Sequence, residues 1–352
     1  MTFQNYKKLL AITAVLLGLA GGLTLAAWYR ENNTPFVSTD FLMDTFIEQK
    51  LYGKNAEEAV NEISTKLQEF ENTFSMHQEN SDISRLNAAA GGEAINLSED
   101  VYQLLERGKK LSLLSEGAFD LTVAPLTQIW QITADNPRVP STNEITMALE
   151  MVDANDLILE EGAGKLNHKG QAIDLGGIAK GAACDIVREV AEKYDIDCGY
   201  VSIGGNLVVL QQKPLGRDFY FGVRDPAGTA SDAVCAITLY GKTMATTGAY
   251  ERYFEKDGKI YHHVIDPQTG WPAESDLLSV SVISEDGTLA DYLSTTLFVL
   301  GKDTVLNCLG RSDFQVIAVG KDGNIYCSAD LKQNIVLTEN STNYDFVYGE
   351  RE

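Results

Sequence analysis

The sequence predicts an α+β fold, in which mixed or antiparallel sheets pack against helices, behind one membrane helix at the N-terminus. Runs rich in β-branched residues predict strands at residues 200–203, 233–239, 278–283 and 314–319. Lys-Asp-Gly turns at residues 256–259 and 321–324 indicate hairpins. Helical segments fall irregularly between the strands, which favours α+β over a doubly wound order. The chain has no GxxxxGK[ST] phosphate loop and no GxGxxG after a strand, so neither ordinary nucleotide-binding fold is indicated.

The first thirty residues, 1–30, predict a membrane-inserting helix. Lys7 and Lys8 precede an uncharged stretch at residues 9–28, which is long enough as a helix to span the roughly 30 Å core of a bilayer. Positive charge before the apolar stretch predicts a cytoplasmic N-terminus and an exported body. A cleaved secretory signal is the alternative, because Ala26 and Ala27 offer a small-residue cleavage site. The length of the stretch favours the uncleaved anchor.

A polar tether at residues 31–39 is expected to lead into a body at residues 40–352, built as one domain or as two intimately packed subdomains. The chain is 44% hydrophobic, which is enough apolar material for a large core. Its formal net charge is -22, and 25 basic and 50 acidic residues follow the first thirty. Because no basic run exists to hold phosphate backbones, nucleic-acid binding is not expected. A pyrophosphate ligand on so acidic a protein would need a metal cation.

The cysteines show neither CxxC nor metal-ligand spacing. Their number is odd, so they cannot all pair within the chain. We expect most of them to be buried small hydrophobes. One disulfide is possible, but the sequence does not indicate which two cysteines would form it. They are Cys184, Cys198, Cys235, Cys308 and Cys327.

Two early segments predict helices that face the core. Apolar residues recur at helical spacing in the first at Ile63, Leu67, Phe70 and Phe74, and in the second at Val101, Leu104, Leu105 and Leu111. Ser98 is placed to cap the second helix and Gly117 to end it.

Four segments contain residues that could bind a ligand or take part in a reaction. The first covers residues 117–126. A glycine, an aromatic beside a carboxylate (Phe119 and Asp120) and then Pro125 could form a loop that presents its backbone and Phe119 to a flat ring. An ordinary helix-to-loop connection, with Asp120 solvating a turn, explains this segment equally well.

The second segment, residues 173–181, runs into an amphipathic helix. Gly176 and Gly177 allow a close backbone approach, the following helix N-terminus attracts anions, and Lys180 adds positive charge. Together these features could hold a phosphate without a phosphate loop. Paired glycines at a strand-to-helix turn also occur for purely steric reasons, so the segment is weak evidence by itself.

The third segment runs from residues 246–252, through the hairpin turn at residues 256–259, to residues 262–270. It holds two of the four histidines, just before an Asp-Pro turn at the end of a strand. His263 is the candidate general base. Neighbouring strand residues face opposite sides, so His262 is expected to be structural, with a hydrogen bond to a nearby carboxylate.

The fourth segment lies within a helix predicted to end near Gly301. Asp291 and Thr295 are four residues apart and share one face, with Ser294 adjacent. Such hard oxygen ligands suit Mg²⁺. The alternative is an acid favoured by the helix dipole, with Thr295 merely packed.

In this order and spacing, the four segments resemble the ApbE family of FAD:protein FMN transferases. Two further motifs match, MDTF at residues 43–46 and FSMH…SDISRLN at residues 74–87. The resemblance spans residues 43–337. It is specific because several separated motifs agree.

The resemblance implies the site residues. The FAD site would be lined by Met43, His77, Ala118, Phe119, Asp120, Asp174, Lys180 and Ile265. Mg²⁺ would be bound by the carbonyl of Gly177 and the side chains of Asp291 and Thr295, with Ser294 as a further ligand, and His263 occupies the position of the base. Three positions depart from the family: Asp44 where glycine is usual, His77 where tyrosine is expected, and Gly177 where Ala, Ser or Thr is common. Many relatives are lipoproteins, whereas this sequence has no lipobox cysteine at the end of the apolar stretch.

The implied reaction is a metal-assisted phosphoryl transfer. Mg²⁺ and Lys180 would neutralise the FAD diphosphate while a Thr or Ser hydroxyl of an exported acceptor flavoprotein, a component of redox complexes, attacks the FMN-side phosphorus and AMP leaves. With water as the nucleophile the protein would be an FAD pyrophosphatase, and the sequence does not separate the two. From another class, the alternative is a non-catalytic flavin-binding protein outside the cytoplasm. Storage alone would not require Asp291, Thr295 and His263 together.

Overall fold

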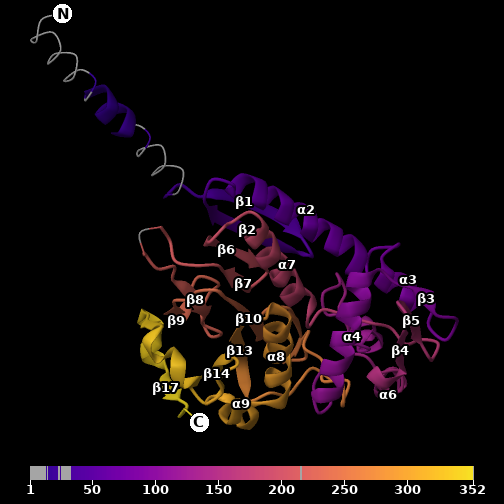
Figure 1. Cartoon of the computed structure of the whole chain (residues 1–352). Coiled ribbons are helices and arrows are strands. Elements are labelled where there is room, and N and C mark those ends of the chain that lie inside the picture. Colours follow the sequence, from indigo (N-terminus) through magenta and orange to yellow (C-terminus); the bar gives the residue numbers. More distant parts are fainter. Residues whose placement is uncertain (1–12, 14, 23, 25–32, 215, 352) are drawn as a thin grey trace, which may run out of the picture.

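The structure, a computed structural model, describes residues 13, 15–22, 24, 33–214 and 216–351. Within these residues the central element is a nine-stranded sheet (Figure 1). Its strand order is β1 (Phe36–Leu42), β2 (Thr45–Tyr52), β6 (Cys198–Ile203), β7 (Asn206–Val209), β10 (Lys242–Gly248), β13 (Leu277–Ser284), β14 (Gln315–Gly320), β15 (Asn324–Cys327) and β17 (Asp345–Tyr348). Neighbouring strands are antiparallel except for β15 and β17, which are parallel.

Both faces of this sheet are covered. Four helices pack on one face: α2 (Ala56–Phe74), α7 (Ala179–Lys193), α8 (Gly287–Leu300) and α9 (Lys302–Cys308). A small sheet of β16 (Ile335–Leu337), β9 (Ala233–Ile237) and β8 (Phe221–Arg224) covers part of the other face through a second apolar cluster. Alternate residues of a strand therefore enter different cores, as Val316 and Ile317 of β14 do.

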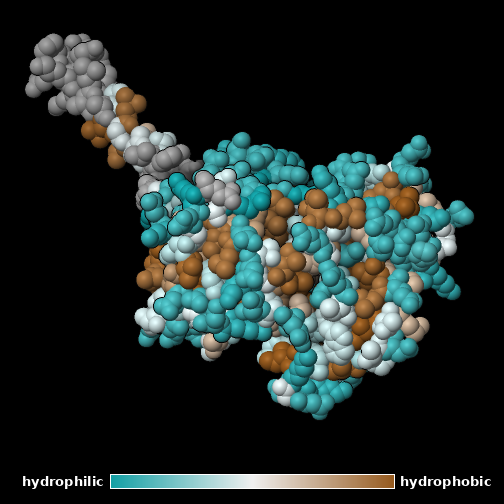
Figure 2. Space-filling view, turned by 90° about the horizontal axis from the view of Figure 1, so that it is seen from below, coloured by the Kyte–Doolittle hydropathy of each residue, from teal (hydrophilic) through white to brown (hydrophobic). Residues whose placement is uncertain are grey.

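A mainly helical part adjoins the open ends of these strands. It contains α3 (Asp82–Ala88), α4 (Glu99–Leu114), α5 (Ala124–Trp130), α6 (Thr142–Leu149) and the sheet β3 (Ile95–Asn96), β5 (Ala163–Leu166) and β4 (Leu157–Glu160). The hairpin of β11 (Tyr253–Lys256) and β12 (Lys259–His262) and the 3₁₀ turns Ala154–Asp156, Ala329–Gln333 and Glu339–Asn343 complete the fold. Figure 2 shows hydrophilic side chains over much of the face seen from below, around smaller apolar groups.

The α+β prediction is confirmed, and so are the main elements. The four predicted strands are β6, β9, β13 and β14, and the two Lys-Asp-Gly turns join β11 to β12 and β14 to β15. The two predicted core helices are α2 and α4. Ser98 occupies the N-cap of α4, but its side chain makes no capping hydrogen bond. Instead its backbone N–H donates to Asp82 Oδ2 at 2.6 Å, which ties α4 to α3.

The ordered body begins earlier than predicted. Strand β1 starts at Phe36, inside the expected tether, because its residues pair with β2 along their whole length. The predicted membrane helix at residues 9–28 lies largely outside the described residues. In the part of the chain that is described, no helix combines the length and apolarity needed to cross a bilayer.

The five cysteines form no disulfide in the described residues. Cys184, Cys235 and Cys327 are buried, as expected of small hydrophobes, and burial raises the pKa of each of these thiols.

Candidate active site

The first turn of α7 touches α8 at a point of very close backbone approach. The N–H of Gly181 donates to Oδ2 of the buried Asp291 at 2.9 Å. A Cβ on Gly181 would lie 2.3 Å from the carbonyl oxygen of Gly287, so only glycine fits at this crossing. The ammonium of Lys180 lies 3.8 Å from Oδ1 of Asp291. One carboxylate thus faces both a backbone donor and a cation.

Three hydroxyl groups lie together where β10 meets α8. Thr247 Oγ1, at the end of β10, is 2.8 Å from Ser294 Oγ and 3.2 Å from Thr295 Oγ1. Ser294 is fully buried and donates to the carbonyl of Asp291 at 2.9 Å. Thr295 is half-buried, and a Cβ on Gly177 would lie 3.6 Å from its hydroxyl. The structure therefore brings Gly177, Ser294 and Thr295 together, and Asp291 lies one helical turn before Thr295 in α8.

Thr247 has no role in the sequence-based prediction. Its contacts to Ser294 and Thr295 span 47 and 48 residues of chain. Strand alternation is the signal that could have found Thr247. It is two residues from Ala245 and so lies on the same face of β10, and Ala245 packs in one apolar cluster with residues of α8.

The donor set suits a hard cation. In the described part of the chain, no three His, Cys, Asp or Glu residues form a group that could hold a metal ion. A cation here would meet one carboxylate, Asp291, with neutral hydroxyl and carbonyl oxygens. Mg²⁺ commonly binds in this way, taking its remaining ligands from water and substrate phosphates.

The glycine loop leads into the N-terminus of α7, where most of the first backbone N–H groups already have acceptors in the loop or in Asp291. Ile178 occupies the N-cap and makes no side-chain capping bond. Asp174 shapes the loop, since Oδ1 accepts from the N–H of Gly176 at 2.8 Å and Oδ2 accepts from the Thr127 hydroxyl at 3.0 Å. A phosphate at this position would meet the positive end of the helix dipole and Lys180.

The segment around Phe119 lies behind the glycine loop. The Phe119 ring is buried edge-on against Tyr292, with 5.2 Å between centroids. A Cβ on Gly177 would lie 2.8 Å from that ring, which explains why glycine occupies a position where the resemblance leads one to expect a larger residue. Ala118 is also buried.

Asp120 has both carboxylate oxygens in internal hydrogen bonds. Oδ1 accepts from the N–H and hydroxyl of Thr122, and Oδ2 accepts from the N–H of Ala154 at 3.0 Å. Burial raises the pKa of this carboxyl group, and the hydrogen bonds counteract that rise. The side chain therefore orders its own loop.

His263 lies just beyond the end of β12 and is half-buried. Its Nδ1 is 3.3 Å from the carbonyl oxygen of Arg252, which also accepts the backbone N–H of His263 at 3.0 Å. Because a carbonyl can only accept, Nδ1 carries the proton and Nε2 is left as a proton acceptor. Desolvation, followed by the charge of Lys180, lowers the pKa of His263 to about 4. The pKa of His263 therefore lies below the near-neutral range in which a general base is most effective.

His262 is structural, as predicted, although its partner is different. Its Nε2 is 3.1 Å from the carbonyl oxygen of Ala273 rather than from a carboxylate. The ring packs edge-on against Phe298, 5.7 Å between centroids, and burial lowers its pKa.

The tight turn between β1 and β2 brings Met43 and Asp44 to the site. Leu42 pairs with Thr45, and Met43 and Asp44 have φ of 55° and 57°. Two left-handed residues in a two-residue hairpin loop favour glycine, which accounts for the family preference at Asp44. The carbonyl of Asp44 accepts from Arg252 Nη2 at 3.3 Å.

The remaining two predicted FAD residues lie at the periphery. Ile265 is buried and pairs with Pro272 in an isolated β-bridge. His77 is exposed in the loop after α2.

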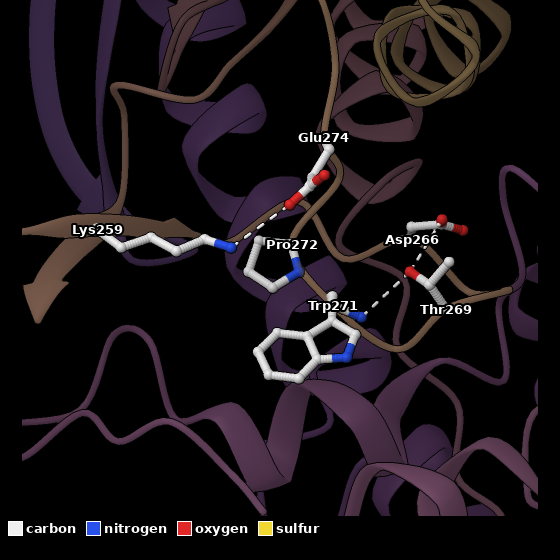
Figure 3. A pocket seen from close by; sticks show the side chains of 6 residues that line it. All are labelled: Lys259, Asp266, Thr269, Trp271, Pro272 and Glu274. Carbon is white, nitrogen blue, oxygen red and sulfur yellow. Dashed lines mark hydrogen bonds and ion pairs between the residues drawn. The ribbon is translucent and has the colours of Figure 1, made fainter. Parts of the chain in front are cut away.

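Two hollows flank these residues. An open groove of about 500 Å³ is lined by Asp44, Ile132, Thr133, Glu251, Arg252 and Tyr253. A second hollow of about 410 Å³ lies beyond the Asp266 turn (Figure 3), where Lys259 pairs with Glu274 at 3.4 Å and the Thr269 hydroxyl donates to Asp266 at 3.0 Å. Only the first adjoins the β1–β2 turn and Arg252, so we take it as the mouth of the site.

Comparison with known proteins identifies the family of the chain. A profile of the ApbE family matches residues 43–318. The FAD:protein FMN transferase of Klebsiella pneumoniae is 31% identical over 301 residues, covering 85% of this chain and 93% of that protein. The FAD:protein FMN transferase of Treponema pallidum is 32% identical over 281 residues, covering 74% and 78%. The crystal structure of the ApbE protein of Thermotoga maritima superimposes with a TM-score of 0.79 at 32% identity, covering 86% and 99%.

Proposed function

The chain belongs to the ApbE family of FAD:protein FMN transferases, and we propose that it transfers FMN from FAD to a Thr or Ser hydroxyl of an exported flavoprotein with the help of Mg²⁺. The observation that carries this proposal is the junction of α7 and α8. There Asp291 meets the Gly181 N–H and Lys180, one helical turn before Thr295, whose hydroxyl contacts Thr247.

Asp291, Thr295 and the carbonyl of Gly177 are the residues that would hold the cation, with Thr247 orienting Thr295. Ser294 is a weaker candidate, because its hydroxyl is fully buried and donates to the carbonyl of Asp291. When bound, Mg²⁺ would offset negative charge on the diphosphate. Lys180 and the dipole of α7 would add to this electrostatic stabilisation.

His263 would accept the proton of the incoming hydroxyl at Nε2. The oxygen of the acceptor Thr or Ser forms a new bond to the FMN-side phosphorus, the bond from that phosphorus to the bridging oxygen breaks, and AMP leaves with the bridging oxygen. A base with a pKa of about 4 is weak at neutral pH. Phosphate charge near Lys180 would offset the cation that depresses this pKa, so we expect substrate to make His263 more basic.

The acceptor would reach the phosphorus through the groove beside Asp44 and Arg252. A docked protein raises the effective concentration of its hydroxyl at the phosphorus, which is how it would outcompete water. We infer an exported location from Lys7 and Lys8 ahead of the apolar stretch. Covalent attachment keeps flavin on redox proteins outside the cytoplasm, where free FMN would diffuse away.

The test is incubation of the protein with FAD, Mg²⁺ and an exported FMN-binding domain, read by mass spectrometry and AMP release. We expect one FMN per acceptor, equimolar AMP, and no labelling once the target Thr of the acceptor is changed to Val. If AMP and free FMN form at one rate with or without acceptor, and the acceptor never gains mass, the protein is an FAD pyrophosphatase.

A further inference from the structure

Asn206 is a buried amide that the transfer mechanism above does not use. It begins β7 and has no exposed surface. Neither its Oδ1 nor its Nδ2 has a hydrogen-bond partner among the described residues. Burying an amide without partners costs free energy, so such a group calls for an explanation.

Strand alternation places this amide on the same face as the helices. Leu207 and Val209 enter the core beneath the small sheet, whereas Val208 packs with α7 residues such as Val187. Asn206 therefore points to the α7 side with Val208. Met244 pairs with Leu207, so the next step of the register sets Asn206 opposite Ala245, two residues before Thr247.

The course of α7 places its first turn over this position. Arg188 donates to the carbonyl of Gly241 and to the hydroxyl of Thr243, which fixes the later part of the helix over the start of β10. Figure 1 shows α7 beside β6 and β7. From Arg188 the helix runs back toward the other end of β7, so Lys180 and Gly181 lie on the side of Asn206.

The turn before Asn206 also borders the groove. Gly204 and Gly205 have φ of 53° and 97°, and a Cβ on Gly205 would lie 3.8 Å from Oε1 of Glu251. Asn206 thus directly follows a turn that borders the groove.

We propose that Asn206 is a positioning residue of the transfer site, whose amide holds a buried water molecule between β7 and the first turn of α7 and so fixes Lys180 and Gly181 against Asp291. Water matches the amide because it can accept from Nδ2 and donate to Oδ1 at once. This inference rests on the proposed function.

The test uses the near-isosteric variant Asn206→Leu of the full chain. Leucine removes two unpaired polar atoms, so we expect the melting temperature to stay the same or rise. We expect kcat for Mg²⁺-dependent AMP release to fall about tenfold or more, because the helix turn loses its register, while KM for FAD changes less than about twofold. Asn206→Ser, which leaves room for water beside a hydroxyl, should recover part of kcat.

Gln49 provides the matched control. It is another fully buried amide, and its Oε1 also lacks a partner among the described residues, but its Nε2 donates to Ser64 at 2.7 Å and to Asp40 at 3.2 Å. We expect Gln49→Met to lower the melting temperature and to keep kcat.

Two results would overturn the proposal. Unchanged kcat in Asn206→Leu would mean that the amide positions nothing, and a joint loss of stability, FAD binding and kcat would mean that it supports only the fold. A parent protein that releases AMP but never labels an acceptor would defeat the transferase proposal while leaving the Asn206 comparison valid.

Discussion

Asp291 is the residue on which the proposed chemistry depends most. Its carboxylate is buried, accepts from Gly181 and faces Lys180. We expect Asp291→Asn to keep the hydrogen bond from Gly181, because an amide oxygen also accepts, but to lose the charge that attracts a cation.

The measurement is AMP release as a function of Mg²⁺ concentration. We expect Asp291→Asn and Asp291→Ala to lose metal-dependent turnover while FAD still binds, more weakly. Asp303→Ala, in the first turn of α9, serves as the control and should titrate like the parent. Normal turnover of Asp291→Asn at micromolar Mg²⁺ would remove Asp291 from the metal site.

The two adjacent histidines should differ in the kind of defect they produce. His263→Gln removes the proton acceptor, so the transfer rate should fall by roughly 10²–10⁴-fold with FAD affinity little changed. His262→Gln disturbs a buried ring bonded to Ala273, so it should lower the melting temperature and affect the rate much less. Single-turnover kinetics and thermal unfolding of both variants distinguish a loss of rate from a loss of stability. Equal rate losses in the two variants would contradict the assigned orientations of the histidines.

The depressed pKa of His263 also predicts a pH dependence of stability. Its folded-state pKa is about 4, below the ordinary value of 6.5, so the unfolded chain binds a proton more readily than the folded one. The free energy of unfolding should therefore fall as pH drops from about 6.5 toward 4, with this contribution fully present above pH 6.5. Denaturant unfolding at pH 7 and pH 5 checks this. His263→Gln should show a smaller drop than the parent, and an equal drop would contradict the assignment.

At the scale of elements, the crossing of α7 and α8 holds the site together. Asp185 of α7 accepts from the N–H groups of Gly287 and Thr288 at the start of α8. Gly181 and Gly287 let the two backbones meet.

Gly181→Ala should force these helices apart. The added methyl would lie 2.3 Å from a backbone oxygen that cannot rotate away. We expect a loss of about 1–3 kcal/mol in the free energy of unfolding and a large loss of kcat, because Lys180 and Asp291 separate. Glu192→Ala, at an exposed position late in α7, should stay within about 0.5 kcal/mol of the parent. Urea denaturation measures the free energy of unfolding of both variants. If Gly181→Ala is as stable as the parent, the two helices have room for a methyl group at their crossing.

Elements with a periodic apolar stripe were predictable from the sequence, and α2 and α4 are examples. The edge strand β1 was not, because its outward residues alternate between polar and exposed apolar, as at Thr39 and Phe41, and resemble a tether. Motif order identified Asp291 and Thr295, but Thr247 joins them only through tertiary contact between β10 and α8. The hydrogen bond from the Ala154 N–H to the Asp120 carboxylate likewise forms only once the two loops are packed, so the sequence did not indicate it.

For the whole molecule, the charge distribution matters. The residues after the first thirty carry 25 basic and 50 acidic groups, so a diphosphate approaches a protein of like charge. In the proposed site, Lys180 and Mg²⁺ would offset this negative charge where the FAD diphosphate binds.

The same distribution leads to a prediction about topology. Lys7 and Lys8 stand before the uncharged stretch at residues 9–28, and the acidic body follows it. Cationic flanks stay in the cytoplasm during insertion, so we expect the body to face outward on an uncleaved anchor. Alkaline phosphatase, which is active only outside the cytoplasm, should be active when fused after Glu352, whereas a reporter active only in the cytoplasm should be silent there. The reverse pattern would overturn the outward topology, and a soluble mature protein beginning near Trp28 would show that the stretch is a cleaved signal. An outward body is also what the transfer reaction requires, because the acceptor hydroxyl and the groove beside Arg252 must meet on the same side of the membrane.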